Sequence, residues 1–189
     1  MFNLQFANRE SRIANEKHIE KKKHNGMRPQ DIAILLKIAT FKDQPWFGKD
    51  LAYSLSISSS EVSESLNRSA FAGLLDDAKK KLMKQSFFEF LEFGFKYVFP
   101  QQPGPIVRGL PTAHSASPLK ELIQSKESFV WPDATGEYRG QAIEPLHPGI
   151  VNAAKIDAKF YELISLADAL RIGRTREQSL AIQELKKRI

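Results

Sequence analysis

The chain of 189 residues contains no cysteine, which excludes disulfides, a thiolate metal site and a cysteine nucleophile. The absence of cysteine fits a protein of the reducing cytoplasm, where we expect this one to act. Tryptophan and tyrosine are also scarce, at 2 and 4 residues against 13 phenylalanines. Most of the aromatic bulk available for a core is therefore phenylalanine.

Long apolar runs are absent as well. No uninterrupted apolar stretch approaches the roughly 20 residues that a transmembrane helix needs, so we expect no membrane association. The N-terminal residues lack the apolar core of a secretory signal.

Signatures of catalysis are equally sparse. The four histidines, His18, His24, His114 and His147, lie far apart, and none has metal-ligand spacing. The sequence contains no glycine-rich phosphate loop and no nucleophile elbow. His114 and Ser115 suggest a base and a nucleophile, but adjacent residues rarely point toward one another. We therefore expect no enzyme, no metal and no cofactor.

What is present is a modest excess of positive charge. The net charge is +6, the sequence pI is about 9.5, and 42% hydrophobic with 26% charged residues is ordinary for a globular protein. A basic chain favours acidic partners, with nucleic acid foremost. The length suits one domain, or one small domain with an extension.

Residues 47–75 organise the rest of the chain. Their spacing predicts two short helices joined by a tight turn, over about 48–55 and 59–71. The first helix has a buried stripe, consisting of Leu51, Ala52 and Leu55. A helix before it is expected from Pro29 to about Ala39, since proline suits a first helical turn.

Two independent signals mark the start of the second helix. Ser58 suits its N-cap, and Glu61 three residues later would complete a capping box. Ile57 and Val62 occupy the two positions of a hydrophobic staple, which fixes the angle at which the chain enters the helix.

The second helix is expected to turn a polar face outward. Its hydroxyl groups can approach a DNA backbone closely, and its N-terminal amides favour a phosphate. Asn67 and Arg68 offer the donor geometry that reads adenine and guanine edges, and Glu64 can accept from cytosine. The candidate DNA-contacting residues of this helix and its cap are Ser58, Ser59, Ser60, Ser63, Glu64, Asn67 and Arg68.

The string "DLAYSLSISSSEVSESLNRSAFAGLL" resembles the corresponding unit of bacterial winged-helix regulators of the MarR type. In those proteins a "DLA…L.is.seVs.sL.r" pattern ends in "GLL" just before the wing. The resemblance is strongest over residues 27–75. It implies a winged helix-turn-helix with a three-helix DNA-binding core, the helix 59–71 in the major groove, and a homodimer whose terminal helices carry dimerisation.

After Leu75 the sequence departs from this family. Lys79, Lys80 and Lys81 stand where a wing hairpin is expected, and they are candidates for contacts with flanking phosphates or for a solvated helix face. The aromatic run that follows predicts a helix to about Phe93, a stop at Gly94 and a strand over 95–99. We therefore expect a wing that is short, displaced or missing.

Three parts of the chain follow from these patterns. Residues 1–26 form a basic extension, either solvated or lying along DNA phosphates. Residues 27–99 form the winged helix-turn-helix domain. Residues 100–189 form a C-terminal extension with an irregular loop, a small hairpin over about 129–143, and two helices over about 155–171 and 175–189. The expected fold is therefore mainly α.

The leading hypothesis is a sequence-specific DNA-binding transcriptional regulator, most simply a repressor that occludes a promoter. The competing hypothesis is an antitoxin-type protein-interaction module, in which residues 95–189 bind a partner protein while the protein also regulates its own operon. A third is a ligand-sensing regulator with a pocket near Trp131.

Overall fold

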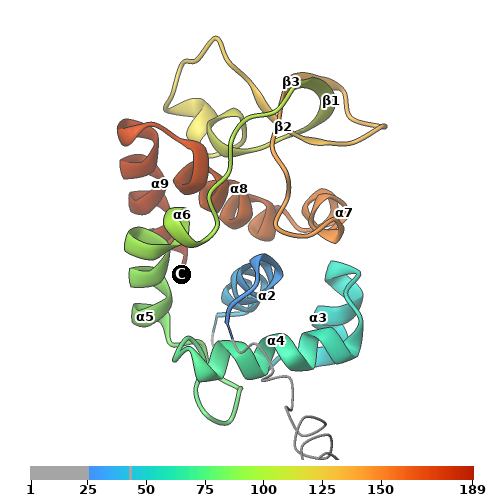
Figure 1. Ribbon diagram of the computed structural model, residues 1–189, viewed down its shortest axis with the longest axis vertical. Coiled ribbons are helices and arrows are strands. Elements are labelled where there is room, and N and C mark those ends of the chain that lie inside the picture. Colours follow the sequence, from blue (N-terminus) through green and yellow to red (C-terminus); the bar gives the residue numbers. More distant parts are fainter. Residues whose placement is uncertain (1–25, 43) are drawn as a thin grey trace, which may run out of the picture.

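The computed structural model describes residues 26–42 and 44–189 (Figure 1). The fold is mainly α-helical with a small three-stranded mixed sheet, which confirms the expected mainly α class. The basic N-terminal extension, apart from Gly26, lies outside the described residues.

A buried helix, α2 (Pro29–Thr40), is the centre of the fold. Its residues 31–39 are all buried, because apolar side chains cover every side of it. It packs against α3 (Gly48–Leu55), α4 (Ser59–Phe71) and α8 (Ala158–Ile172). The expected bounds of 48–55 and 59–71 are confirmed.

The expected strand over 95–99 is wrong, because the segment after α4 is helical there. Leu75 and Leu82 form an isolated antiparallel bridge, and a continuous helical run follows. That run consists of α5 (Lys84–Glu89), the π-helical turn η1 (Phe90–Gly94) and α6 (Phe95–Val98). Gly94 thus lies inside a helical run and does not stop it. Burial of Phe87, Leu91 and Phe95, spaced by four, holds this run against the core.

The sheet consists of β1 (Ile106–Pro111), β2 (Phe129–Pro132) and β3 (Tyr138–Ala142). β1 pairs antiparallel with both other strands, and these two pair parallel with each other, so the three strands close on themselves. The expected hairpin of β2 and β3 is therefore wrong. Gly109 lies opposite both Pro132 and Tyr138, and a Cβ there would stand 1.9 Å from the carbonyl oxygen of Trp131. Only glycine permits strands this close.

Two short 3-10 segments, η2 (Ala113–Ser115) and η3 (Leu119–Glu121), connect β1 to β2. Beyond the sheet lie α7 (Gly149–Ile156), α8 and α9 (Thr175–Arg188). The expected helix over 155–171 is interrupted at Asp157, whose carboxylate accepts from the amide of Phe160 and starts α8. α9 begins at Thr175, and Arg174 is its N-cap.

The two halves of the chain pack together. α8 contacts α2 and α6, and α7 contacts α3. Lys37 of α2 donates to Asp157 at a distance of 2.5 Å, although Lys37 is 8% exposed. Asp168 of α8 is buried and accepts from Thr112, Trp131 and Arg171, which joins α8 to the sheet region. In the described ranges, no helix is long and apolar enough to cross a membrane.

Candidate nucleic-acid interface

α4 begins with the N-cap and the hydrophobic staple expected from the sequence, but with only one of the two hydrogen bonds of the capping box. The hydroxyl of Ser58 accepts from the amide of Glu61 at 3.2 Å, and it also lies 3.1 Å from the hydroxyl of Ser60. Ile57 and Val62 are both buried, as a hydrophobic staple requires. The second hydrogen bond of the capping box, from the backbone amide of Ser58 to the Glu61 carboxylate, is not formed. The Glu61 carboxylate is engaged instead by cationic and amide donors of other residues.

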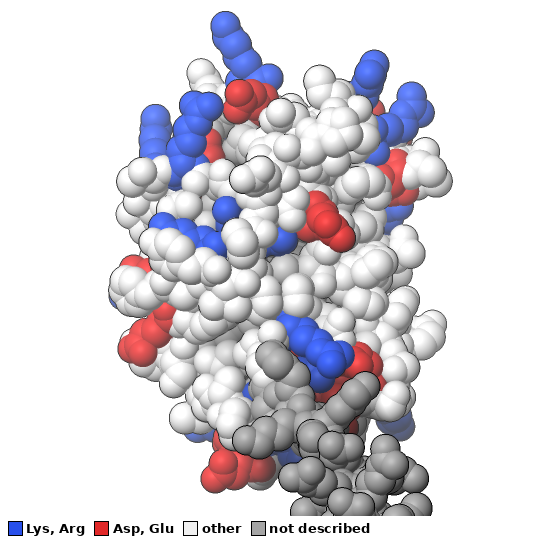
Figure 2. Space-filling model, viewed as in Figure 1, with Lys and Arg blue, Asp and Glu red and all other residues white. Residues whose placement is uncertain are grey.

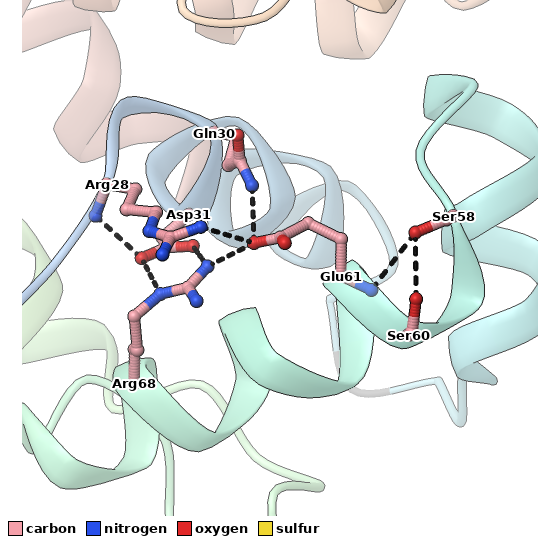
Figure 3. Close-up of polar contacts among 7 residues, drawn as sticks. All are labelled: Arg28, Gln30, Asp31, Ser58, Ser60, Glu61 and Arg68. Atoms are coloured by element: carbon pink, nitrogen blue, oxygen red, sulfur yellow. Dashed lines mark hydrogen bonds and ion pairs between the residues drawn. The ribbon is translucent and has the colours of Figure 1, made fainter. Parts of the chain in front are cut away.

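Those donors belong to a polar cluster between α2 and α4 (Figure 3). The Glu61 carboxylate accepts from Arg68 at 2.7 Å and from Gln30 at 2.6 Å, and it lies 3.4 Å from the guanidinium of Arg28. The hydrogen bond from Arg68 holds the pKa of Glu61 below its usual value. Asp31 accepts from the backbone amide of Arg28 at 2.7 Å, so it also caps the start of α2.

Arg68 does not belong to the residues that face outward from α4, contrary to the expectation that it would face the major groove. Its side chain turns inward and donates to both carboxylate oxygens of Asp31, through Nε at 2.8 Å and Nη2 at 2.6 Å. Arg68 is 6% exposed and Asp31 is fully buried. Their hydrogen bonds raise the pKa of the Arg68 guanidinium, which stays charged. Because a buried carboxylate requires a paired cation, Arg68 orients α4 and is not available to a base edge.

The outer face of α4 remains polar and open to solvent. Ser58, Ser59, Ser60, Ser63 and Asn67 are exposed, and Glu64 is partly exposed. Inward-facing Ser65 and Ser69 are buried, and their small side chains allow close packing of α4 on α2. The exposed residues are short hydrogen-bonding groups on one side of an ordered helix, and a major groove accommodates such a helix.

The three lysines lie in a tight loop between Leu75 and Leu82, and not on a helix. The Asp76 carboxylate accepts from the amides of Lys80 and Lys81, at 2.7 and 2.8 Å. The backbone hydrogen bonds from Lys81 and Lys80 lower the pKa of Asp76 below its usual value. The loop is therefore a tight turn closed by the single bridge of Leu75 with Leu82, and the three lysines lie on its returning side.

One contact joins this loop to α4. Lys79 Nζ donates to the side-chain oxygen of Asn67 at 2.9 Å. In Figure 1, α4 runs along the lower edge of the molecule, and the loop projects below its C-terminal end. Lys80 and Lys81 are exposed and Lys79 is partly exposed. The polar face of α4 and the lysine-bearing loop therefore lie next to each other on one side of the protein.

Other residues weighed from the sequence have structural roles. His114 Nε2 lies 3.0 Å from the carbonyl oxygen of Glu127, and the Ser115 hydroxyl accepts from the amide of Phe129. Trp131 is fully buried and donates to Asp168, so its ring belongs to the core and does not line a pocket mouth. Within the described ranges, histidine and carboxylate side chains nowhere cluster in a way that could hold a metal ion.

Sequence reasoning missed Asp31 as the partner of Arg68. In the first turn of a helix, an aspartate by itself indicates only a favourable charge near the positive end of the helix dipole. The available signal was the run Ile32–Ala39, which is apolar enough to bury its helix on every side and therefore to bury Asp31 as well. A buried carboxylate demands a cation, and Arg68 is the nearest one on the helix packed against it.

Comparison with known proteins adds no relative: no family model, no curated protein and no solved structure matches this chain.

Proposed function

We propose that the protein is a sequence-specific DNA-binding transcriptional regulator, most simply a repressor. In this proposal α2, α3 and α4 form a helix-turn-helix core, α4 enters the major groove, and the 76–81 loop serves as a reduced wing. The resemblance of residues 27–75 to MarR-type regulators supports the same proposal and implies a homodimer on DNA.

The proposal rests on one observation: α4 and the 76–81 loop lie next to each other on one side of the protein. Ser59, Ser60, Ser63 and Asn67 expose short hydrogen-bonding groups, and the loop adds the ammonium groups of Lys80 and Lys81 beside them. Short polar groups suit base edges and sugar-phosphate oxygens, and lysines suit flanking phosphates. The inward ion pair of Arg68 with Asp31 fixes the rotation of α4 about its axis, so the polar face is presented in one orientation.

The experiment compares two duplexes by fluorescence anisotropy, one from the region upstream of the protein's own gene and one with that sequence scrambled. Base readout predicts binding to the native duplex that survives near roughly 200 mM salt, where phosphate contacts alone are strongly weakened. Equal and steeply salt-dependent binding to both duplexes would reduce the function to a basic surface.

A second candidate function has one observation in its favour. Phe93 and Tyr97 are 66% and 73% exposed on the helical run after the loop, and Val98 beside them is 52% exposed. Exposed neighbouring apolar side chains are typical of protein-protein contacts. An antitoxin-type module would use this surface, within residues 95–189 and the helix before them, to hold a partner protein. Co-purification with the product of the neighbouring gene, lost in Phe93→Ser/Tyr97→Ser, tests it.

A further inference from the structure

Two arginines lie side by side on the sheet, at the end of the molecule opposite α4 (Figure 1). Arg108 of β1 and Arg139 of β3 are direct partners in the antiparallel register, and both are exposed. Directly opposed residues of an antiparallel pair have Cα atoms roughly 4.5–5.5 Å apart and side chains on the same face. The two guanidinium groups therefore project from neighbouring points in one direction.

This pair has no internal compensation. Through residues 26–42 and 44–189, neither side chain makes an ion pair or a hydrogen bond with another residue. Like charges directly opposite one another destabilise a sheet. By contrast Arg174, exposed at the start of α9, lies 3.5 Å from the carboxylate of Glu127. The Arg108–Arg139 pair thus costs stability in the free protein, and an anion bound between the two would relieve that cost.

The backbone under the pair is fixed. A Cβ at Gly140 would stand 2.5 Å from the carbonyl oxygen of Ser128, and one at Gly136 would stand 2.5 Å from Gly109. Strands packed this closely cannot shift relative to one another without losing the closed sheet. The backbone positions of the two arginines are therefore held at a set separation, so that binding one ligand requires ordering of the two side chains but no movement of the strands.

The chemistry of the face suits a phosphodiester backbone. Guanidinium groups pair with phosphate oxygens in a planar, two-bond geometry, and successive phosphates of one DNA strand follow at about 3.4 Å along the axis. Gln141, two residues from Arg139 and therefore on the same face, adds a neutral donor. Figure 2 shows lysine and arginine side chains projecting from this upper end, with acidic residues between them. Of the nearby acids, Asp133 is engaged by Lys155, and Glu137 is exposed.

We propose that the Arg108–Arg139 face is a second phosphate-binding surface, which holds the backbone of a DNA segment other than the one on α4. Because the two surfaces lie at opposite ends of the molecule, one protein bridges two duplexes. The contact at the sheet is independent of sequence, since it reaches phosphates and not base edges. The inference rests on the proposed function only for the first of the two duplexes.

The test uses the full chain and two duplexes. A duplex from the upstream region is immobilised and saturated with protein, and retention of a labelled duplex of unrelated sequence is measured. We expect the wild type to retain the labelled duplex and Arg108→Gln/Arg139→Gln to lose retention while binding the immobilised duplex as before. The matched control Lys126→Gln/Arg176→Gln removes the same charge at exposed positions and should retain it.

A second measurement is made in Lys79→Gln/Lys80→Gln/Lys81→Gln protein, in which the phosphate contacts proposed for the loop beside α4 are removed. Binding of the unrelated duplex to this protein is followed over a salt series, and the slope of log K against log salt should fall by about 1.8 when Arg108→Gln/Arg139→Gln is added, the loss of two phosphate contacts. Failure of the proposed function would appear as equal binding of native and scrambled DNA, which leaves this slope difference intact.

Several results of the retention experiment would overturn the inference. They are a wild type that retains no second duplex, a double arginine variant that retains it fully, and a control that loses retention equally. A variant that loses binding to polyglutamate but not to DNA would also overturn it, in favour of an acidic protein partner. Folding is checked by thermal denaturation, where removal of the like-charge pair should leave Tm unchanged or slightly raised.

Discussion

Asp31 and Arg68 are joined by two hydrogen bonds, 2.8 Å from Nε and 2.6 Å from Nη2, with both side chains withdrawn from solvent. Asp31 lies in the first turn of α2, and Arg68 lies in the last turn of α4. A bidentate guanidinium-carboxylate pair fixes both distance and orientation. It therefore determines which face of α4 the protein turns outward.

The first prediction concerns this pair. Arg68→Met leaves the Asp31 carboxylate buried without its cation, which should lower the free energy of unfolding by about 3–5 kcal/mol in urea denaturation. Asp31→Leu/Arg68→Met removes both charges and should recover most of that loss. If Arg68 read a guanine instead, the single variant would keep its stability and lose discrimination between native and scrambled DNA.

The second prediction concerns base readout by α4. Asn67→Ala removes an exposed amide that can pair with a base edge, and about 1–3 kcal/mol of discrimination between native and scrambled duplex should be lost. Anisotropy titrations of both duplexes measure the ratio. Asn152→Ala, at an exposed asparagine of α7 on a different helix, is the matched control. An unchanged ratio in Asn67→Ala would remove Asn67 from the groove.

The third prediction separates phosphate contact from base readout. Lys80→Ala should weaken both duplexes about equally, and the slope of log K against log salt should fall by about 0.9. Lys186→Ala removes an exposed lysine of α9 and should leave both affinities unchanged. Selective weakening of the native duplex alone would contradict a phosphate role for Lys80.

The fourth prediction is a dependence of stability on pH. Arg68 lowers the pKa of Glu61 in the folded protein below its unfolded value of 4.5. The stability contributed by Glu61 is therefore complete above pH 4.5 and is lost as the pH falls through the lowered folded value. Glu61→Gln should lose less stability between pH 5 and the acid limit than wild type, as measured by urea midpoints.

The control for that measurement is Glu89→Gln, at an exposed carboxylate that accepts from the neutral Gln85. It should follow the acid profile of the wild type. A Glu61→Gln profile parallel to the wild type would show that the Arg68–Glu61 contact contributes nothing in solution.

The fifth prediction concerns the closed sheet. Gly109→Ala places a Cβ 1.9 Å from a backbone oxygen that cannot move freely, and the free energy of unfolding should fall by about 1–3 kcal/mol or more. Gly104→Ala is the matched control, because its Cβ would meet its nearest neighbour at an ordinary 3.4 Å. Equal stability of the two variants would indicate that the strands separate in solution.

The sequence by itself determined the features that depend on contacts between residues close together in the chain. α3 and α4 begin and end where capping and periodicity predict, since the cap of Ser58 and the buried spacing of Leu51 and Leu55 act within one or two helical turns. The polar outer face of α4 follows from the same spacing. These features require no information about distant parts of the chain.

The tertiary structure decided what depends on distant partners. Arg68 turns inward because Asp31, 37 positions earlier in the chain, is buried against it. Residues 95–98 are helical because Phe95 continues a buried row begun at Phe87, which outweighs the strand preference of an aromatic run. β2 and β3 run parallel because both pair with β1 across Gly109. In each case a contact across the fold outweighs the local preference, and neighbouring residues alone do not encode that contact.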